Sequence, residues 1–368
     1  MKKKNLCKTL LKTMCIVLGI LILALLAYIV YLYASYYRIE DNQELVVEAP
    51  VDNTTTGAAA VLATDTEYSA VTYNIGFGAY LPDYSFFMDG GTSSWAESPE
   101  TVQYAINGAG ELVKSLDPDF ALIQEIDLDA TRSYHTDEYE MLRNILPEYT
   151  TVFAQNYDSA FLFYPFTQPH GSSRAGLGLF SKYPVSSALR RSFPISTSFS
   201  KFFDLDRCYS VSRIPVDNGK ELVIFNLHMS AYGNSDEIRK GQTEMLCNDM
   251  AKEYEAGNYV LCGGDFNHDL KASEEDAESC ESWAFPFPRS ELPEHFTFCL
   301  DLLTEEEQAA LWNSARNADM EYVPGVTYTV TLDGFIISDN IECLSYENVN
   351  TGYSYSDHDP VKVEFMLK

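Results

Sequence analysis

The sequence predicts an α/β fold in which two packed sheets are flanked by helices, and it predicts one transmembrane helix before this domain. Strand-like runs outnumber helical runs, and the two kinds are interleaved without strict strand–helix–strand alternation, which favours two sheets over one doubly wound sheet. One uncharged apolar stretch near the N-terminus is long enough to span a bilayer. No internal repeat is visible, and about 300 residues beyond the N-terminal region suffice for one large domain or two small ones.

The N-terminal region divides into a basic segment, an apolar segment and a linker. Residues 1–12 contain five lysines, and residues 13–37 contain no charged residue. Because a bilayer core needs about 20 apolar residues, residues 13–37 are predicted to be a single transmembrane anchor with the N-terminus in the cytoplasm. A cleaved signal peptide is the alternative, although its apolar region is usually about 7–15 residues long. Residues 38–66 have no helical or strand period and are predicted to form a flexible linker.

The elements of the remaining domain, residues 67–368, follow from hydrophobic period and β-branched content. Strands are expected at residues 69–73, 120–124, 150–153, 177–180, 209–215, 222–227, 259–262, 327–338 and 361–366. Helices are expected at residues 102–115, 138–146, 236–255 and 305–316. The third of these helices is amphipathic and is expected to be capped by Asn234 or Ser235.

Five short polar motifs stand at the polar ends of apolar, β-branched runs. They are Tyr73-Asn74-Ile75, Gln124-Glu125, Asn226-Leu227-His228, Gly264-Asp265-Phe266-Asn267 and Ser356-Asp357-His358-Asp359. Each motif delivers a carboxylate, amide or imidazole group, and each one alone is a common strand-end or turn composition. Together, and in this order, they point to one site for metal-assisted hydrolysis.

The charge of the chain restricts the partners it can bind. The formal net charge is −29, and because residues 1–38 carry only positive charges, the remainder is about six units more negative. Such a domain repels polyanions at long range, and no Lys/Arg stripe offsets the repulsion. This disfavours a high-affinity nucleic-acid binder, but a bound divalent metal would still supply local positive charge to a nuclease.

Taken together, the motifs of residues 67–368 resemble those of the endonuclease/exonuclease/phosphatase superfamily of deoxyribonuclease-like, metal-dependent phosphoesterases. The resemblance implies a four-layer α/β/β/α sandwich of two mixed sheets. It also implies Mg²⁺ as the cofactor, with Mn²⁺ as a substitute. Mg²⁺ keeps several of its waters and binds through one or two carboxylates, so a site for it needs few protein ligands.

The resemblance assigns the metal and the attacking water to particular residues. Glu125 and Asp357 are expected to bind the metal, and Asn74 is expected to act as an amide ligand or a phosphate contact. Asp265 is expected to orient or deprotonate the water, and Asn267 to hold a phosphoryl oxygen. These assignments match the chemistry, because hydrolysis of a phosphate ester requires charge neutralisation and an activated water.

The imidazoles are expected to stabilise the phosphate. By resemblance, His228 and His358 contact the phosphoryl oxygens, and Asp333 orients His358. A neighbouring carboxylate would favour the protonated form of such a histidine.

Two further segments resemble the family less closely. Arg207 stands where many members have an arginine entering a strand, and its guanidinium suits a phosphate oxygen, whereas an ion pair with Asp204 or Asp206 is the alternative. Residues 173–184 resemble the family's glycine-rich strand, but Arg174-Ala175-Gly176 replaces the common Asn-Gly-Gly, which leaves the substrate contact of this strand open. His170 either contributes there or is a loop histidine, and the loop assignment is favoured.

The sequence therefore predicts an extracytoplasmic, membrane-anchored, metal-dependent hydrolase of a small or lipid-borne phosphoester, with no protein partner evident. A coil of about 28 residues would hold the site within about 30 Å of the membrane. An extracellular nuclease with the same site is one alternative. A non-catalytic surface module on the same fold is the other. Aromatic residues that would suit a nucleic-acid groove, but could equally contact lipid or pack a loop, are Tyr164, Phe166, Trp283, Phe285 and Phe287. The last three belong to residues 271–297, which are expected to form a surface loop near the site.

Overall fold

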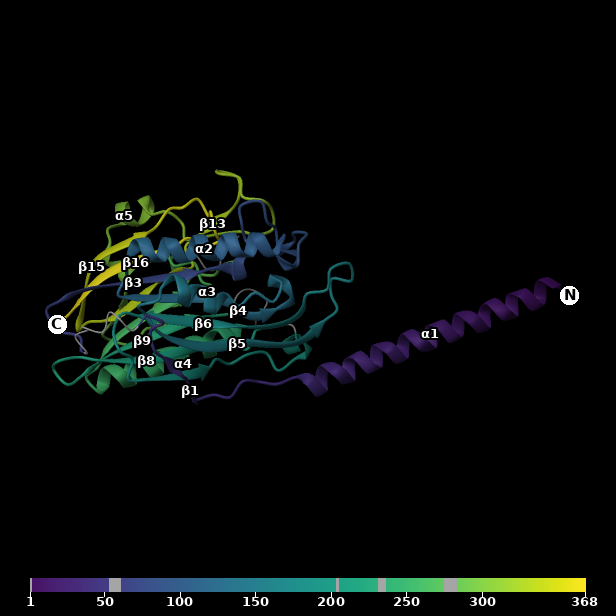
Figure 1. The fold of residues 1–368 in the computed structure, drawn as a ribbon, viewed down its shortest axis with the longest axis horizontal. Coiled ribbons are helices and arrows are strands. Elements are labelled where there is room, and N and C mark those ends of the chain that lie inside the picture. The colour runs from purple at the N-terminus through teal and green to yellow at the C-terminus, as the bar shows by residue number, and fades with distance from the viewer. Residues whose placement is uncertain (1, 53–60, 203–204, 231–235, 275–282) are drawn as a thin grey trace. The chain divides into compact units, whose positions relative to one another are not determined.

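A computed structural model describes residues 2–52, 61–202, 205–230, 236–274 and 283–368. The chain divides into two compact units, Met1–Arg38 and Ile39–Lys368, and each is described by itself. The first unit is the helix α1 (Lys2–Ser35) (Figure 1). By length and composition, its segment Cys7–Ser35 can cross a membrane, a test that a signal sequence near the N-terminus also passes.

In the part of the second unit that the structure describes, two seven-stranded sheets dominate (Figure 1). The first has the strand order β1 (Gln43–Glu44), β7 (Ser187–Ser192), β8 (Cys208–Pro215), β9 (Glu221–His228), β10 (Tyr259–Asp265), β14 (Asp333–Ser338) and β11 (Phe296–Phe298). The second has the order β15 (Ile341–Asn348), β16 (Val361–Leu367), β3 (Glu67–Asn74), β4 (Phe120–Ala130), β6 (Gly171–Ser181), β5 (Thr150–Leu162) and β2 (Val47–Glu48). Both sheets are mixed, because β9 runs parallel to β10 and β3 runs parallel to β4 while the other neighbours are antiparallel.

Four helices accompany these sheets in the described residues, together with a short ladder of two strands. The helices are α2 (Pro99–Leu116), α3 (Glu138–Ile145), α4 (Asp236–Glu255) and α5 (Glu305–Ala310). The ladder pairs β12 (Ala315–Arg316) with β13 (Thr329–Val330).

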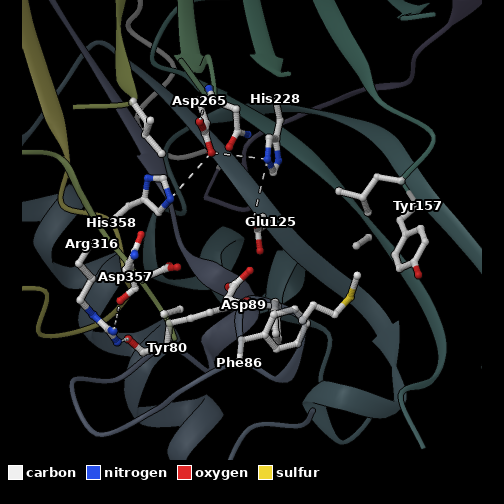
Figure 2. Close-up of a pocket in the computed structure, with 18 of the residues that line it drawn as sticks. Tyr80, Phe86, Asp89, Glu125, Tyr157, His228, Asp265, Arg316, Asp357 and His358 are labelled. Atoms are coloured by element: carbon white, nitrogen blue, oxygen red, sulfur yellow. Dashed lines mark hydrogen bonds and ion pairs between the residues drawn. The ribbon is translucent and has the colours of Figure 1, made fainter. Parts of the chain in front are cut away.

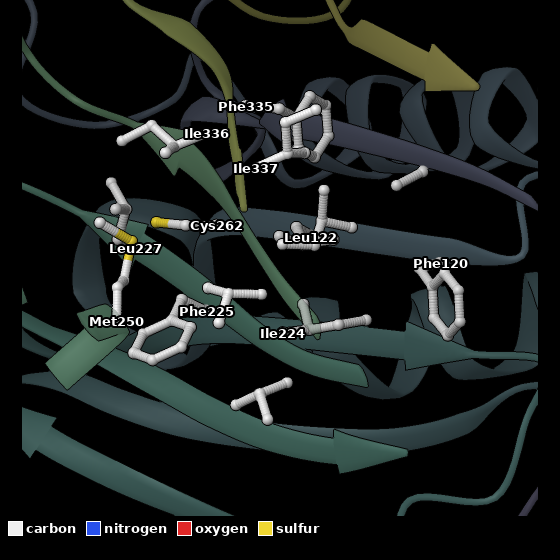
Figure 3. Packing of buried hydrophobic residues seen from close by; sticks show 14 of the residues in the cluster. Phe120, Leu122, Ile224, Phe225, Leu227, Met250, Cys262, Phe335, Ile336 and Ile337 are labelled. Atoms are coloured by element: carbon white, nitrogen blue, oxygen red, sulfur yellow. The ribbon is translucent and has the colours of Figure 1, made fainter. Parts of the chain in front are cut away.

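The side chains of β4 alternate between two hydrophobic clusters, because successive residues of a strand point to opposite faces. Phe120 and Leu122 point into the cluster between the two sheets, where they meet residues of the other sheet such as Phe225 (Figure 3). Ala121 and Ile123 belong to the second cluster, which α2 and α3 cover. The helix α4 adds side chains to the first cluster and contacts β10 of the other sheet. The predicted helix–sheet–sheet–helix layering is therefore confirmed.

Most predicted strands are present and are longer than the sequence indicated, as in β4, β5 and β6. The helix predicted at residues 305–316 is wrong in its second half, because Leu311 adopts an extended ψ of 139° and residues 315–316 pair as β12. The strand predicted at residues 327–338 is divided into β13 and β14, and β7 and β15 were not predicted. The capping residues proposed for α4, Asn234 and Ser235, lie outside the described residues.

The flexible linker predicted for residues 38–66 is wrong in its first part. β1 pairs with β7, and β2 pairs with β5, so these short strands form an edge of each sheet. The backbone N–H of Ile39 also donates to Asp206 Oδ2 at 2.7 Å. A strand of two residues shows no period in the sequence, and an edge strand needs only backbone hydrogen bonds on one side. The reach calculated for a free coil of about 28 residues no longer applies, while residues 53–60 lie outside the described part of the chain.

A close approach of two strands near the end of β10 requires glycine. Gly264 has a φ of +148°, and a Cβ atom added there would lie 2.1 Å from the backbone oxygen of Leu227. We expect Gly264→Ala to lower the free energy of unfolding by about 3 kcal/mol, because backbone atoms must move to relieve the overlap. Chemical denaturation would measure this loss.

The matched control is Gly219→Ala. Gly219 also has a positive φ, +81°, but an added Cβ would meet no atom within 4 Å. This change should cost only about 1–2 kcal/mol, which is the price of a left-handed backbone alone. Equal losses in the two variants would contradict the close-approach explanation.

Candidate active site

A pocket of about 420 Å³ collects most of the predicted polar residues (Figure 2). Of the residues predicted from the motifs, those that line it are Glu125, Arg207, His228, Asp265, Asn267, Asp357 and His358. The remaining two, Asn74 and Asp333, are buried behind the wall and hydrogen-bond to residues that line it.

Strand register explains why residues distant in sequence meet here. His228 at the end of β9 is paired with Asp265 at the end of β10, and Asp265 is in turn paired with Asp333 at the start of β14. In the other sheet, Asn74 at the end of β3 is paired with Gln124 of β4. Polar residues at the ends of neighbouring strands are thus brought to one edge of each sheet, and the packed sheets bring the two edges together.

Two of the predicted residues have a left-handed backbone. Glu125 has a φ of +57° at a bulge of β4, where the pairing with β6 shifts between Ile123 and Ile126. Asn267 has a φ of +51° in the loop after β10. Non-glycine residues in this region carry strain of about 1–3 kcal/mol, which persists where the surrounding structure holds them. A bulge also changes the direction in which a side chain points, and at this bulge the Glu125 carboxylate lies in the pocket wall.

Asn74 connects the two sheets. Its Nδ2 donates to Glu125 Oε1 and to Asp265 Oδ2, both at 3.1 Å, and its Oδ1 accepts from the backbone N–H of Gly76 at 3.0 Å. Both amide hydrogens are therefore directed at carboxylates, and the oxygen already has a donor. This geometry favours an orienting role for Asn74 over the predicted role as a metal ligand or phosphate contact.

The two predicted histidines have opposite protonation tendencies. Burial lowers the pKa of His228 well below its usual value, and the positive charges of Arg207 and His358 lower it further. Burial also opposes the charge of His358, but attraction and a hydrogen bond to Asp333 outweigh this effect and raise the pKa of His358 well above its usual value. Neutral and charged imidazoles therefore stand on either side of the Asp265 carboxylate (Figure 2).

The Asp265 carboxylate is central to this arrangement. Its Oδ2 lies 3.5 Å from His228 Nε2 and 3.8 Å from His358 Nε2, and its Oδ1 accepts from the backbone N–H of Asn267 at 2.8 Å. Burial raises the pKa of Asp265 to about 7, although His358 lowers it and Asp333 raises it further. A carboxylate with this pKa can accept a proton near neutral pH.

Asp333 holds His358 in place from the buried side. Its Oδ2 accepts from His358 Nδ1 at 2.7 Å and from Ser314 Oγ at 2.7 Å. Ligand atoms of Asp265, Asp333 and His358 lie within 4.8 Å of one another, which is close enough to surround a metal ion. Because the Asp333 oxygen already has two donors and His358 is charged, this trio is better suited to hold and move a proton than to bind a cation.

The acidic side of the pocket fits a hard divalent cation. Burial raises the pKa of Asp357 to about 6, His358 lowers it, and the negative charge of Glu125 raises it. A third carboxylate, Asp89, faces Glu125 (Figure 2), and its Oδ1 has no hydrogen-bond partner among the described residues. Burial raises the pKa of Asp89 to about 7, and the charges of Asp357 and Glu125 add to the effect. A divalent cation among these oxygens would relieve their repulsion, and oxygen is the ligand atom that Mg²⁺ prefers.

Arg207 presents unused donors to the pocket. The residue is buried, and its Nε and Nη1 have no hydrogen-bond partner in the described part of the chain. Of the two acids considered as ion-pair partners, Asp206 accepts from the backbone of Ile39, and Asp204 lies outside the described residues. Two unused N–H groups in a pocket wall are suited to a phosphoryl oxygen.

Three further residues of the pocket wall were missed or misjudged in the sequence analysis. His170 lies in the loop before β6, as the sequence analysis favoured, but its side chain is buried in the pocket wall and its Nδ1 has no partner among the described residues. Burial and then Arg132 lower its pKa to about 3, which keeps the ring neutral. Arg132 lies 3.7 Å over the ring of Phe77, and Arg316 donates to the backbone oxygens of Tyr80 and Leu81.

Two segments whose roles were left open in the sequence analysis, residues 173–184 and the predicted surface loop of residues 271–297, each contribute a residue to the pocket wall. Arg174 of β6 is exposed and pairs with Asp129 at 3.1 Å, so only Ala175 of its tripeptide lines the pocket. In the predicted surface loop, Trp283 lines the pocket whereas Phe287 is buried in a hydrophobic cluster, and residues 275–282 lie outside the described residues.

Comparison with known proteins identifies relatives of this fold. A family model described as "Endonuclease/Exonuclease/phosphatase family" matches residues 71–300. No curated protein matches the sequence. Similar solved structures include an endonuclease/exonuclease/phosphatase from Beutenbergia cavernae, with 15% identity, a TM-score of 0.54, and coverage of 82% of this chain and 72% of that one.

Two other similar structures carry a bound molecule. One is D. rerio TDP2 complexed with a single-strand DNA product, with 14% identity, a TM-score of 0.53, and coverage of 82% of this chain and 99% of that one. The other is the human Nocturnin catalytic domain with a bound sulfate anion, with 14% identity, a TM-score of 0.52, and coverage of 82% and 94%. At such low sequence identity, the similarity to these structures establishes the fold alone.

Proposed function

Because the chain belongs to the endonuclease/exonuclease/phosphatase family, whose members are generally metal-dependent phosphoester hydrolases, we propose that it hydrolyses a small or lipid-borne phosphoester with Mg²⁺ or Mn²⁺. One observation carries the proposal: a buried carboxylate, Asp265, lies between a neutral and a charged imidazole, beside three carboxylates that suit a cation. This arrangement combines a proton acceptor, anion-stabilising groups and metal ligands in one pocket.

In the proposed reaction Glu125 and Asp357 would hold the metal, and Asp89 adds a third carboxylate beside them. A divalent metal bound there would neutralise the charge of the phosphoryl group and favour ionisation of a water. Asn74 fixes the positions of Glu125 and Asp265 relative to each other, because its amide nitrogen bonds to both.

The residues of the opposite wall act on the water and the phosphate. Asp265 accepts a proton from the attacking water as the water oxygen bonds to phosphorus. The bond to the ester oxygen breaks with its electron pair on that oxygen, which leaves and takes up a proton from solvent. The charged His358, the two N–H groups of Arg207 that have no partner among the described residues, and the second Nδ2 hydrogen of Asn267 can donate to phosphoryl oxygens. Asp333 keeps His358 oriented and charged during the reaction.

We further propose that α1 is an uncleaved, single-pass anchor, with residues 1–12 in the cytoplasm and the catalytic domain outside. The five lysines before the apolar segment support this orientation. A substrate at or near a membrane surface would then be the most accessible one.

An extracellular nuclease with the same site is the second candidate, and the similar fold of a TDP2 bound to single-strand DNA product favours it. The net charge of −29 disfavours it, because nucleic-acid affinity depends on many Lys and Arg contacts to phosphates. A non-catalytic surface module would have no use for the Arg207 donors, which lack a partner among the described residues, or for the histidine pair around Asp265.

A substrate panel tests the proposal. The full-length protein in detergent, with Mg²⁺ and at moderate salt, is offered a chromogenic phosphodiester, phospholipid head-group esters, sugar phosphates, nucleotides and duplex DNA. We expect turnover of small or head-group esters and slow cleavage of DNA. Rapid cleavage of DNA with neglect of the small esters would establish the nuclease. Metal binding with no turnover of any compound would establish the non-catalytic module.

A further inference from the structure

The tip of the hairpin between β5 and β6 carries an exposed cluster of large apolar side chains. Phe163 is 50% exposed, Tyr164 is 59% exposed and Phe166 is 86% exposed. Met88, 54% exposed, belongs to the neighbouring 3-10 helix Phe87–Asp89. We call these four residues the apolar rim. Clusters of exposed apolar side chains on a soluble domain mark sites of interaction, because their exposure to water is unfavourable.

The segment that forms the tip is free of formal charge. Residues 159–173 contain no Asp, Glu, Lys or Arg, and the first charged side chains on either side are Asp158 and Arg174. The absence of formal charge removes the cost of burying a charge if the tip enters an apolar medium.

The apolar rim borders the mouth of the active-site pocket. The ring of Tyr164 lies 5.8 Å from that of Phe87, and the ring of Phe87 lies 6.1 Å from that of His170. The backbone N–H of His170 also donates to the oxygen of Tyr164 at 3.1 Å. His170 and Met88 both line the pocket. A surface that contacts the apolar rim would therefore lie beside the entrance of the pocket.

We propose that the apolar rim inserts into the interfacial layer of a lipid bilayer and presents lipid head-group phosphates to the pocket. Aromatic rings prefer this layer, and the rim combines two phenylalanines with a tyrosine. The helix α1, proposed above as an uncleaved anchor, would keep a bilayer within reach of this domain. This inference rests on the proposed function and narrows its substrate to a lipid-borne phosphoester.

The charge of the domain restricts which bilayer it meets. The net charge of the chain is −29, and the domain without residues 1–38 is about six units more negative, so it repels anionic lipids, and the rim binds through apolar insertion and not through charge attraction. Binding is therefore expected on zwitterionic vesicles, with little dependence on salt. A second copy of the chain could cover the same side chains, and the experiment distinguishes this outcome from insertion into a bilayer.

The test uses a chain that starts at Ile39, because the anchor itself would bind any vesicle. All members of both large hydrophobic clusters lie between Leu62 and Leu367, and both sheets begin after Ile39, so this chain retains its whole core. We expect it to float with phosphatidylcholine vesicles in a density gradient. The double substitution Phe163→Asp and Phe166→Asp should weaken this binding at least about tenfold.

A matched control and a second readout make the result specific. Leu344, 40% exposed on the edge strand β15 at the opposite end of the sheet, is the control site, and Leu344→Asp should bind vesicles as the unaltered chain does. Phe166→Trp should show a blue shift of its fluorescence on addition of vesicles. The double variant should hydrolyse a soluble phosphodiester at the normal rate but lose at least about tenfold of its rate on vesicle-borne lipid.

The outcomes are distinct. Failure of the unaltered chain to float, or equal flotation of the double variant, would overturn the inference. Dimers in sedimentation that the double substitution disrupts, without flotation, would assign the rim to a second copy and also overturn it. Vesicle binding without turnover of any phosphoester would leave the rim in place and contradict the proposed function instead.

Discussion

Removal of divalent metal is expected to abolish turnover of a soluble phosphodiester while the domain stays folded. Glu125, Asp357 and Asp89 bring three carboxylates to one side of the pocket, and burial with mutual repulsion raises the pKa of both Asp357 and Asp89. Without a cation these groups repel an anionic substrate, and no other group described there takes over the role of a Lewis acid. Chelation followed by addition of Mg²⁺ or Mn²⁺ should restore the rate, while circular dichroism should stay unchanged throughout.

Two variants distinguish the loss of a metal ligand from the loss of one negative charge elsewhere on the acidic domain. Glu125→Gln should raise the Mg²⁺ concentration needed for half-maximal rate by tenfold or more, because a carboxylate ligand becomes a neutral amide. Glu342→Gln changes an exposed glutamate of β15 and should leave the Mg²⁺ dependence unaltered. Full turnover in excess chelator would exclude a metal-dependent mechanism.

Asp265→Ala and His358→Ala are each expected to lower kcat by a factor of about 10² to 10⁴ without unfolding the protein. Asp265 is the proton acceptor within reach of both imidazoles, and His358 is the buried, charged imidazole that Asp333 stabilises. Removal of either side chain takes away a group used mainly in the transition state, so kcat should change more than KM. Steady-state kinetics of the full-length protein would measure both constants.

The chain offers a matched control for the histidine variant. His295 and Asp339 form an exposed pair with a separation of 2.7 Å, the same separation as His358 and Asp333. His295→Ala should retain the normal rate, because the pair lies outside the pocket lining. Normal rates in Asp265→Ala or His358→Ala would reject the roles assigned to these residues. A loss of rate in His295→Ala would show that the effect is not specific to the site.

The polar motifs could be predicted from the sequence because each one ends an apolar strand. A run of β-branched residues encodes a strand, and the parallel pairings β3 with β4 and β9 with β10 align the ends of such strands. Local pattern thus predicts which polar groups stand at strand ends, and packing of the two sheets brings Glu125 together with His228 and Asp265. The same reasoning holds for the predicted membrane helix, which depends only on the length and composition of one segment.

The residues that the sequence analysis missed reach the pocket from very short elements. Asp89 lies in the 3-10 helix Phe87–Asp89, Arg132 lies in the 3-10 helix Thr131–Ser133 that follows β4, and Arg316 lies in the two-residue strand β12. Single-sequence patterns carry no information on these positions, because such short elements are positioned by contacts with residues far away in the chain. The strands β1 and β2 were missed for a related reason, since each consists of two residues held by backbone hydrogen bonds to a distant strand.

The sequence by itself determined the layered α/β fold, the order of the polar motifs and the chemistry that their side chains can perform. Only the tertiary structure decided how these groups act on one another. It directed the amide of Asn74 at two carboxylates, made His228 neutral and His358 charged, and exposed Phe166 while burying Phe287. The physical reason is that composition and period are local properties, whereas burial, hydrogen-bond partners and electrostatic environment arise from residues that meet only when the chain is folded.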